Sequence, residues 1–329
     1  MKLISYPADY SSAHKENYFL FEGVDVATPT EICFYDGAGE LLGARRYVAR
    51  ESILSSPRTF VERLLSPEPI LSERLECCTP KGREAALAVG YNNDTDRSPV
   101  IHFTASHSDV PLRAMMGQGA HRRTISLGEC DEVAFRAAEG DNLVVTATLN
   151  DKVGIHIIHN STLPQGGINV LIVNPAHIIA KLQPREEVEA IHLTLSVGGQ
   201  KLGTLHYTII PAAKGSTRLA WLNRDGYISY HTFRKTEQEE LKTSRSECET
   251  PSGTLTLGGE SWRERRLHSG YLSAEQEEQL LGIVTSPRVW MITPEGAVPQ
   301  AIISHSVATQ GKGAHTLELT IRPSRKERF

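Results

Sequence analysis

The stretch NPAHIIAKLQ, residues 174–183, repeats the pattern of SPRTFVERLL, residues 56–65, at an offset of 118 residues. Each begins with a helix-capping residue type, Ser56 or Asn174, followed by a proline suited to the first helical position. Apolar side chains then recur at the spacing of a short helix with one buried face. They are Phe60, Val61 and Leu64 in the first stretch and Ile178, Ile179 and Leu182 in the second. Both stretches are therefore predicted to be short helices of the same kind.

The internal repeat continues without a gap, because residues 75–91 align with residues 193–209 at the same offset. Each segment is predicted to be a strand, a turn containing Pro or Gly, and a second strand. Only five of the 36 positions from 56 to 91 are identical to their counterparts, which is close to chance. The evidence for a repeat is therefore the shared order of predicted elements. We interpret it as an internal duplication. The alternative is that any β-rich chain offers two hairpins after short helices.

Most other segments indicate short strands. LVVTATL (143–149) and HTLELTI (315–321) alternate apolar and polar residues with period two. The polar stretch 234–253 is expected to be a long exposed strand or loop. Ser273, followed three residues later by Gln276, forms a capping box at the start of one further helix.

The predicted fold is therefore mainly β. It has tandem β-sandwich-like domains over residues 1–115 and 116–214, each with one short helix. A C-terminal β-rich domain with one capped helix follows over residues 215–329.

The composition fits a globular protein and excludes several classes of partner. The chain has 329 residues, of which 40% are hydrophobic and 22% charged, with a net charge of −4. This charge gives no field for nucleic acid or an anionic membrane, so neither is predicted as a partner. No run approaches the roughly 18 apolar residues of a membrane helix. The N-terminal stretch lacks the apolar core of a signal peptide, so cytoplasmic synthesis is expected.

Motifs that carry chemistry are missing from the sequence. The five cysteines include no C-x-x-C spacing, and the 13 histidines do not fall at zinc-ligand spacing. No G-x-S-x-G nucleophile motif occurs. The acidic segment SLGECDE, residues 126–132, lacks the alternating oxygen ligands of an EF-hand and is predicted to be a solvated loop. We therefore predict no catalytic residue, no cofactor and no metal site.

The segment RLAWLNRDGYISYHTF, residues 218–233, is rich in aromatic residues in a chain poor in them. Asp225-Gly226 predicts a hairpin with a two-residue type I′ turn. That register would place Trp221 opposite Tyr230. Both faces of the hairpin carry apolar side chains, so it should be covered twice, once by its own domain and once by a neighbouring domain or subunit.

This hairpin, the polar KTSRSE that follows it and the segment SGYLSAEQEEQLLGIVTSPRVWMI (269–292) resemble one family. It comprises structural proteins encoded in tail modules of phages and prophages of gut Bacteroidetes. The opening ISYPADYSSAHKENYFLF (4–21) is also similar to the N-termini of that family. The residues that fit its pattern are Trp221, Asn223, Arg224, Gly226, Phe233, Ser286, Pro287 and Val289. The sequence departs from it at 227–229, where relatives often carry a Trp-Asp-like pair.

The resemblance implies a non-catalytic structural or assembly protein of a phage tail or baseplate-like particle, located in the virion. Its implied partners are other tail proteins and further copies of itself. A carbohydrate- or cell-surface-binding module, with glycan as its ligand, is the alternative, and a cell-wall hydrolase is the third hypothesis. The residues predicted to form the interface are Trp221, Asn223, Arg224, Gly226, Tyr227, Tyr230, Phe233, Pro287 and Trp290.

Overall fold

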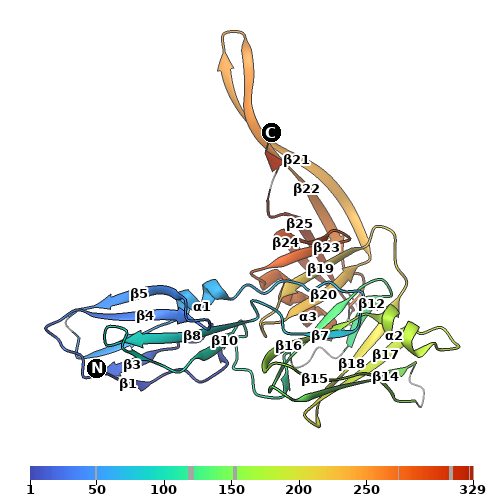
Figure 1. The fold of residues 1–329 in the computed structure, drawn as a ribbon. Helices are drawn as coiled ribbons and strands as arrows, with labels where there is room; N and C mark the ends of the chain where they lie inside the picture. The colour runs from blue at the N-terminus through green and yellow to red at the C-terminus, as the bar shows by residue number, and fades with distance from the viewer. Residues whose placement is uncertain are drawn as a thin grey trace.

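The computed structural model describes residues 1–48, 50–117, 122–150, 154–272, 274–310, 314–325 and 327–328. Within these residues the chain is mainly β, as predicted, and contains three helices. Its largest hydrophobic clusters lie in three regions that follow one another along the chain. Figure 1 shows the N-terminal region as a sandwich on one side, with the C-terminal region above the second region and a long hairpin projecting from it.

The first region is a sandwich of two sheets, ordered β1-β3-β6 and β2-β10-β8-β4-β5, with β9 beside β8. Its core contains six phenylalanine, isoleucine and leucine side chains without solvent exposure: Phe19, Phe21, Ile32, Phe34, Leu87 and Phe103. Its elements are β1 (Lys2–Ser5), β2 (Ser11–Ser12), β3 (Phe19–Glu22), β4 (Thr30–Asp36), β5 (Leu41–Tyr47), β6 (Ser52–Ser55), α1 (Arg58–Leu64), β8 (Glu84–Tyr91), β9 (Asp96–Arg97) and β10 (Ile101–Thr104).

The second region is built in the same way, with sheets ordered β11-β13-β16-β7 and β12-β18-β17-β14-β15. Its elements are β11 (Ala114–Met115), β12 (Arg122–Ser126), β13 (Asp131–Ala137), β14 (Asn142–Leu149), β15 (His156–Thr162), β16 (Gly167–Val173), α2 (Pro175–Leu182), β17 (Ala190–Val197) and β18 (Gln200–Ile210). The edge strand β7 (Glu76–Cys78) comes from the sequence of the first region and pairs with β16.

Both regions share one topology. In each, the first, third and sixth strands form one sheet, and the second strand runs parallel to the last one, β2 with β10 and β12 with β18. Lettered along the chain, the sheets have the order A-B-E and A′-G-F-C-C′, which is that of immunoglobulin-like sandwiches. This common order supports the duplication, which stays a prediction together with the boundaries at 115 and 214.

The predicted gapless register is wrong after the first helix. Residues 75–91 do not form a hairpin, because β7 pairs with β16 and β8 pairs with β4 and β10. In the sheet order β8 therefore corresponds to β17, whereas the offset of 118 residues aligns it with β18. The physical reason is the connection after α1, which crosses to the second region before returning to its own sheet. The predicted second hairpin, β17 with β18, is present.

The two short helices begin differently. The Asn174 side chain accepts the backbone N–H of His177 at 3.0 Å, and Pro175 occupies the first turn, as predicted. In α1 the N-cap is Pro57, with no side-chain cap, so the predicted cap at Ser56 is wrong. In both helices the predicted apolar stripe packs on the core of its own region.

The third region is one eight-stranded sheet ordered β20-β19-β23-β24-β25-β22-β21, with β26 beside β22. The helix α3 packs against β19 and β25. It begins at Ala274, and the predicted cap Ser273 lies outside the described residues. The elements are β19 (Thr217–Leu222), β20 (Ile228–Phe233), β21 (Lys235–Thr250), β22 (Gly253–His268), α3 (Ala274–Thr285), β23 (Val289–Thr293), β24 (Gly296–Gln310), β25 (Ala314–Pro323) and β26 (Glu327–Arg328).

The polar stretch after residue 234 is the long exposed strand that was one of its two predicted forms. β21 and β22 each have 16 residues and pair along their whole length. At about 3.3 Å per residue they extend for roughly 50 Å. The last residues of β22 also pair with β25, and Glu260 and Ser261 pair with β26. The rest of the hairpin projects beyond the sheet as a two-stranded ribbon (Figure 1). We call this ribbon, residues 239–262, the arm.

Candidate functional site

The aromatic hairpin is formed by β19 and β20, but its turn differs from the prediction. The Gly226 N–H donates to the Asn223 carbonyl at 3.1 Å, and the Asn223 N–H donates to the Tyr227 carbonyl at 3.0 Å. Gly226 has φ 76°, whereas Arg224 and Asp225 are not left-handed, so a type I turn followed by a glycine bulge replaces the expected type I′ turn. The Asn223 side chain stabilises this turn by accepting the Asp225 N–H at 2.9 Å.

The longer loop shifts the strand register by one residue. Trp221 lies opposite Ser229, and Tyr230 lies opposite Ala220, so the predicted pairing of Trp221 with Tyr230 is wrong. Since side chains alternate along strands, the two aromatic residues face opposite sides of the sheet. Trp221 packs with Phe233 in the core beneath α3. Tyr230 packs on the other side, beside Trp290.

The second face of the hairpin is covered by the second region of the same chain. Arg218 donates through Nη1 to Glu129 Oε2 at 3.0 Å and through Nη2 to the Cys130 carbonyl at 2.6 Å. The Thr232 hydroxyl donates to Glu129 Oε1 at 2.8 Å. The hairpin is thus buried on both sides within one chain, by the helix α3 and by the second region.

The acidic segment 126–132 is the element that meets the hairpin, and its prediction as a solvated loop is wrong. Asp131 and Glu132 are 3% and 1% exposed. Asp131 accepts hydrogen bonds from Arg123 Nη1 at 2.7 Å and from the Tyr207 hydroxyl at 3.0 Å. The carboxylates can be buried because arginines and hydroxyls from other strands pair with them.

Glu132 connects all three regions through one carboxylate. Arg83, which precedes β8 of the first region, donates to Glu132 Oε2 at 2.5 Å, and both side chains are 1% exposed. Oε1 accepts the Ile70 N–H at 2.7 Å and the hydroxyl of Tyr230, from the third region. Burial raises the pKa of Glu132 although Arg83 acts in the opposite direction. Burial, followed by the charge of Glu132, raises the pKa of Tyr230.

The tip of the hairpin contacts the connection that follows the first region. The His107 N–H donates to the Arg224 carbonyl at 2.8 Å. A Cβ atom on Gly226 would lie 2.4 Å from the backbone nitrogen of Ser106, so only glycine fits this approach. Tyr227 is 4% exposed and packs in a small core with Tyr10 of the N-terminal segment.

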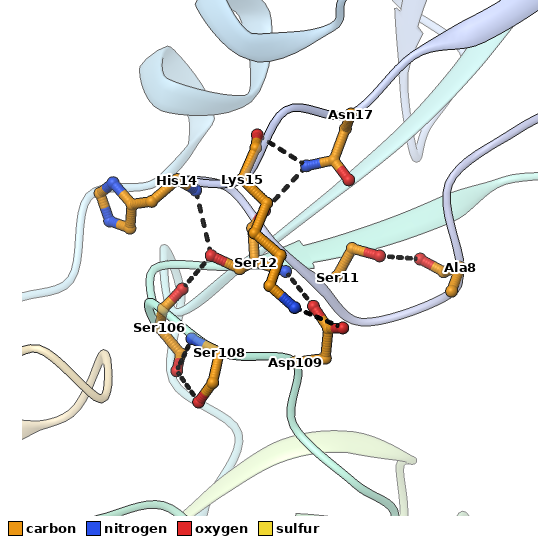
Figure 2. A network of polar contacts seen from close by, with 9 residues as sticks. All are labelled: Ala8, Ser11, Ser12, His14, Lys15, Asn17, Ser106, Ser108 and Asp109. Carbon is orange, nitrogen blue, oxygen red and sulfur yellow. Dashed lines mark hydrogen bonds and ion pairs between the residues drawn. The ribbon is translucent and has the colours of Figure 1, made fainter.

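The N-terminal segment is tied to the same connection by polar contacts (Figure 2). The Ser12 hydroxyl donates to the Ser106 carbonyl at 2.5 Å. Asp109 accepts the Ser12 N–H at 3.0 Å and the Lys15 ammonium at 2.8 Å. Burial opposes ionisation of Asp109, but these hydrogen bonds lower its pKa overall. Residues 106–109 therefore join the N-terminal motif to the hairpin, two parts of the sequence that carry the resemblance.

The Ser-Pro motif after α3 lies beside the hairpin. The Ser286 hydroxyl donates to the Leu222 carbonyl at 2.8 Å, and the Leu222 N–H donates to the Arg288 carbonyl at 3.1 Å. Pro287 thus lies beside the end of β19, and Trp290 in β23 lies opposite Ala220 in β19. Of the residues predicted to form the interface, Asn223, Arg224 and Pro287 line one pocket here. Trp221 and Phe233 lie instead in the core of the third region, and Tyr230 packs with Trp290 on the other face of the sheet. Their role in contacts with other proteins stays a prediction.

Sequence reasoning missed the arginines of this junction. Nothing local in the sequence distinguishes Arg83 or Arg218 as a buried partner. The one available signal was the acidic run 126–132, which has three carboxylates in seven residues.

A cleft of about 470 Å³ lies between the hairpin loop and α3. Its lining includes Arg123, Trp221, Tyr227, Gln279 and Gly282. The Trp221 indole nitrogen and the Gln279 amide nitrogen are buried and have no hydrogen-bond partner among the described residues. These are donor groups, so the cleft could offer hydrogen bonds to acceptor atoms of a small ligand.

In the described part of the chain, no helix is both long and apolar enough to cross a bilayer. The same residues contain no group of three His, Cys, Asp or Glu side chains arranged to hold a metal ion.

No protein-family model and no curated protein matches the sequence. Among solved structures, a chain from the tail of an empty gene transfer agent particle overlaps with a TM-score of 0.22 and 18% identity, covering 30% of this chain and 84% of that one. A chain from the virion of a native gene transfer agent particle gives a TM-score of 0.23 and 17% identity, with coverages of 34% and 95%. The BSP domain of a biofilm-associated protein gives 0.19 and 14%, with coverages of 63% and 29%. At these TM-scores the overlaps establish neither a shared fold nor a shared role.

Proposed function

We propose that this protein is a non-catalytic structural component of a phage tail or baseplate-like particle. The observation that carries the proposal is the junction at Glu132, where one buried carboxylate of the second region receives hydrogen bonds from the other two regions. A junction of this kind fixes the orientation of the regions, which suits a part that must place contact surfaces at set positions. The hairpin that carries part of the sequence resemblance supplies Tyr230 to this junction, which supports the same class.

The arm supports the proposal independently. It carries Leu241, Leu255 and Leu257, which are 64%, 54% and 65% exposed. A two-stranded ribbon is at best marginally stable in water. A ribbon with exposed leucines is therefore suited to contact another protein in an assembly.

The test is to delete the gene in its native host and to examine the particles by electron microscopy and infection. We expect incomplete or non-infective particles, restored by the gene supplied in trans. Mass spectrometry of purified particles should find the protein at a fixed ratio to tail components. Assembled, infective particles from the deletion strain would refute the proposal.

A saccharide-binding role is the second candidate, and the cleft beside α3 favours it. The unpartnered donors of Trp221 and Gln279 suit sugar hydroxyl groups, and Glu278 at the lining could accept from them. A glycan array with the purified protein tests this. Binding should be lost in Gln279→Leu and retained in Gln200→Leu, which changes an exposed glutamine on the second region. Absence of any glycan ligand would dismiss this candidate.

A further inference from the structure

The arm has an open backbone edge. In the described residues β21 pairs with β22 alone, so it forms the end of the eight-stranded sheet. The outward N–H and C=O groups of an edge strand can pair with a strand of another chain. Because β21 is 16 residues long, this edge is far longer than one needed only to complete the sheet.

The side chains of the arm are acidic and partly apolar. Residues 239–260 contain five glutamates and only two basic residues. Glu247 and Glu249 are two residues apart on β21, so both project from one face. They lie toward the tip, where Leu255 and Leu257 of β22 are exposed.

The strand β5 of the first region has the complementary character. It is the end strand of its sheet and, among the described residues, pairs with β4 alone. Residues 41–50 contain three arginines, Arg45, Arg46 and Arg50, and no acidic residue. Arg46 and Arg50 are exposed, and Leu41 and Val48 are 59% and 61% exposed. This edge therefore offers unpaired backbone, positive charge and apolar surface together.

We propose that the arm of one copy pairs edge to edge with β5 of the next copy, so that β21 adds a strand to the sheet of the first region. Charge complementarity and the two open edges select a second copy of this chain as the partner. The arm and the first region are separate projections of the molecule in Figure 1. The contact is then heterologous, since each copy donates an arm and accepts another, and it leads to a ring or a filament. This deepens the proposed structural role and rests on it.

Exposed ion pairs weaken as salt screens them, whereas strand pairing persists. Self-association of the purified chain should therefore increase with protein concentration and decrease as salt rises. Sedimentation velocity measures both dependences on the full-length protein. The double variants Arg46→Glu/Arg50→Glu and Glu247→Lys/Glu249→Lys should each shift association to at least tenfold higher concentration.

Combining all four substitutions should restore association, because the charges are then exchanged between the two edges. A variant in which an Asn-Gly turn replaces residues 244–260 should be monomeric at every concentration. The control Arg74→Glu/Arg185→Glu reverses two exposed arginines elsewhere and should behave as wild type. Circular dichroism checks that each variant folds.

A wild-type protein that is monomeric at every concentration and salt would overturn the inference. The inference would also fail if either double variant left association unchanged, or if the variant with all four substitutions did not regain association. None of these results affects the proposed function, which depends on whether the protein is found in particles. A monomer that is present in particles would refute the arm contact and leave the structural role intact.

Discussion

Replacing Glu132 by Gln removes the charge that pairs with Arg83 and retains a similar shape. Both side chains are 1% exposed, so the guanidinium would stay buried without a counter-ion. Breaking a buried pair in this way costs about 3–5 kcal/mol. Because domains of ordinary size have stabilities of about 5–15 kcal/mol, this is a large fraction of the total. We expect the loss to appear as uncoupling of the regions, since Glu132 also accepts the hydroxyl of Tyr230.

Urea denaturation followed by two probes tests this expectation. The three tryptophans, Trp221, Trp262 and Trp290, all lie in the third region, so their fluorescence reports on that region. Far-ultraviolet circular dichroism reports on strands throughout the chain. The two transitions should coincide in the wild type. In Glu132→Gln the fluorescence transition should occur at lower urea than the dichroism transition.

Two comparisons sharpen the result. Glu187→Gln changes an exposed carboxylate of the second region and should leave both transitions unchanged. Adding Arg83→Met to Glu132→Gln removes the stranded charge, so part of the loss should be recovered. If Glu132→Gln keeps coincident transitions at the wild-type midpoint, the junction does not couple the regions and the reasoning fails.

Three further substitutions test other parts of the structure. Gly226→Ala should lower the free energy of unfolding by at least about 2 kcal/mol, because φ is 76° and the new Cβ would meet the backbone of Ser106. Its control, Gly215→Ala, has φ 81° but open space around it, so it should cost only about 1 kcal/mol. Urea denaturation measures both. Burial, followed by the charge of Arg218, lowers the pKa of His231 from its ordinary 6.5 to about 4, so its contribution to stability is present above pH 6.5 and is lost as the pH falls toward 4. The thermal unfolding midpoint of His231→Leu should therefore fall less over this pH window than that of the wild type. An identical fall in both proteins would show that His231 is not the cause. Asn174→Ala should cost about 1 kcal/mol through loss of the helix cap, and an unchanged midpoint in thermal unfolding would contradict this role.

The elements that were predicted correctly are those determined by residues close together in the sequence. The cap at Asn174 and the apolar stripes of the two short helices depend on residues close in sequence, and the structure confirms them. The stretch after residue 234 takes the strand form, one of the two forms predicted for it. The helix α1 also forms where expected, but its cap differs because Ser56 lies one residue too far upstream.

The turn of the hairpin shows where local reasoning stops. Asp225-Gly226 is compatible with a type I′ turn and with a type I turn plus glycine bulge. The Asn223 side chain and the approach of Ser106 favour the second, and Ser106 is more than a hundred residues away in the sequence. The resulting shift of one residue places Trp221 and Tyr230 on opposite faces.

The acidic segment was mispredicted for the same reason. Its own composition indicates exposure, because isolated carboxylates avoid the interior. The arginine partners, Arg83 for Glu132 and Arg218 for Glu129, come from distant parts of the sequence. A single sequence gives no means of pairing these residues, so the junction could be found only in three dimensions.

The crossing of β7 has a consequence for synthesis on the ribosome. This strand is made with the first region, but its partner β16 follows about 90 residues later, a delay of roughly 5–20 s at ordinary translation rates. During that interval the first sandwich can close, while the segment with Cys77 and Cys78 has no sheet to join. The nascent chain therefore holds an unpaired strand with two thiols until the second region emerges, and a chaperone or a slow codon would act most usefully in this interval.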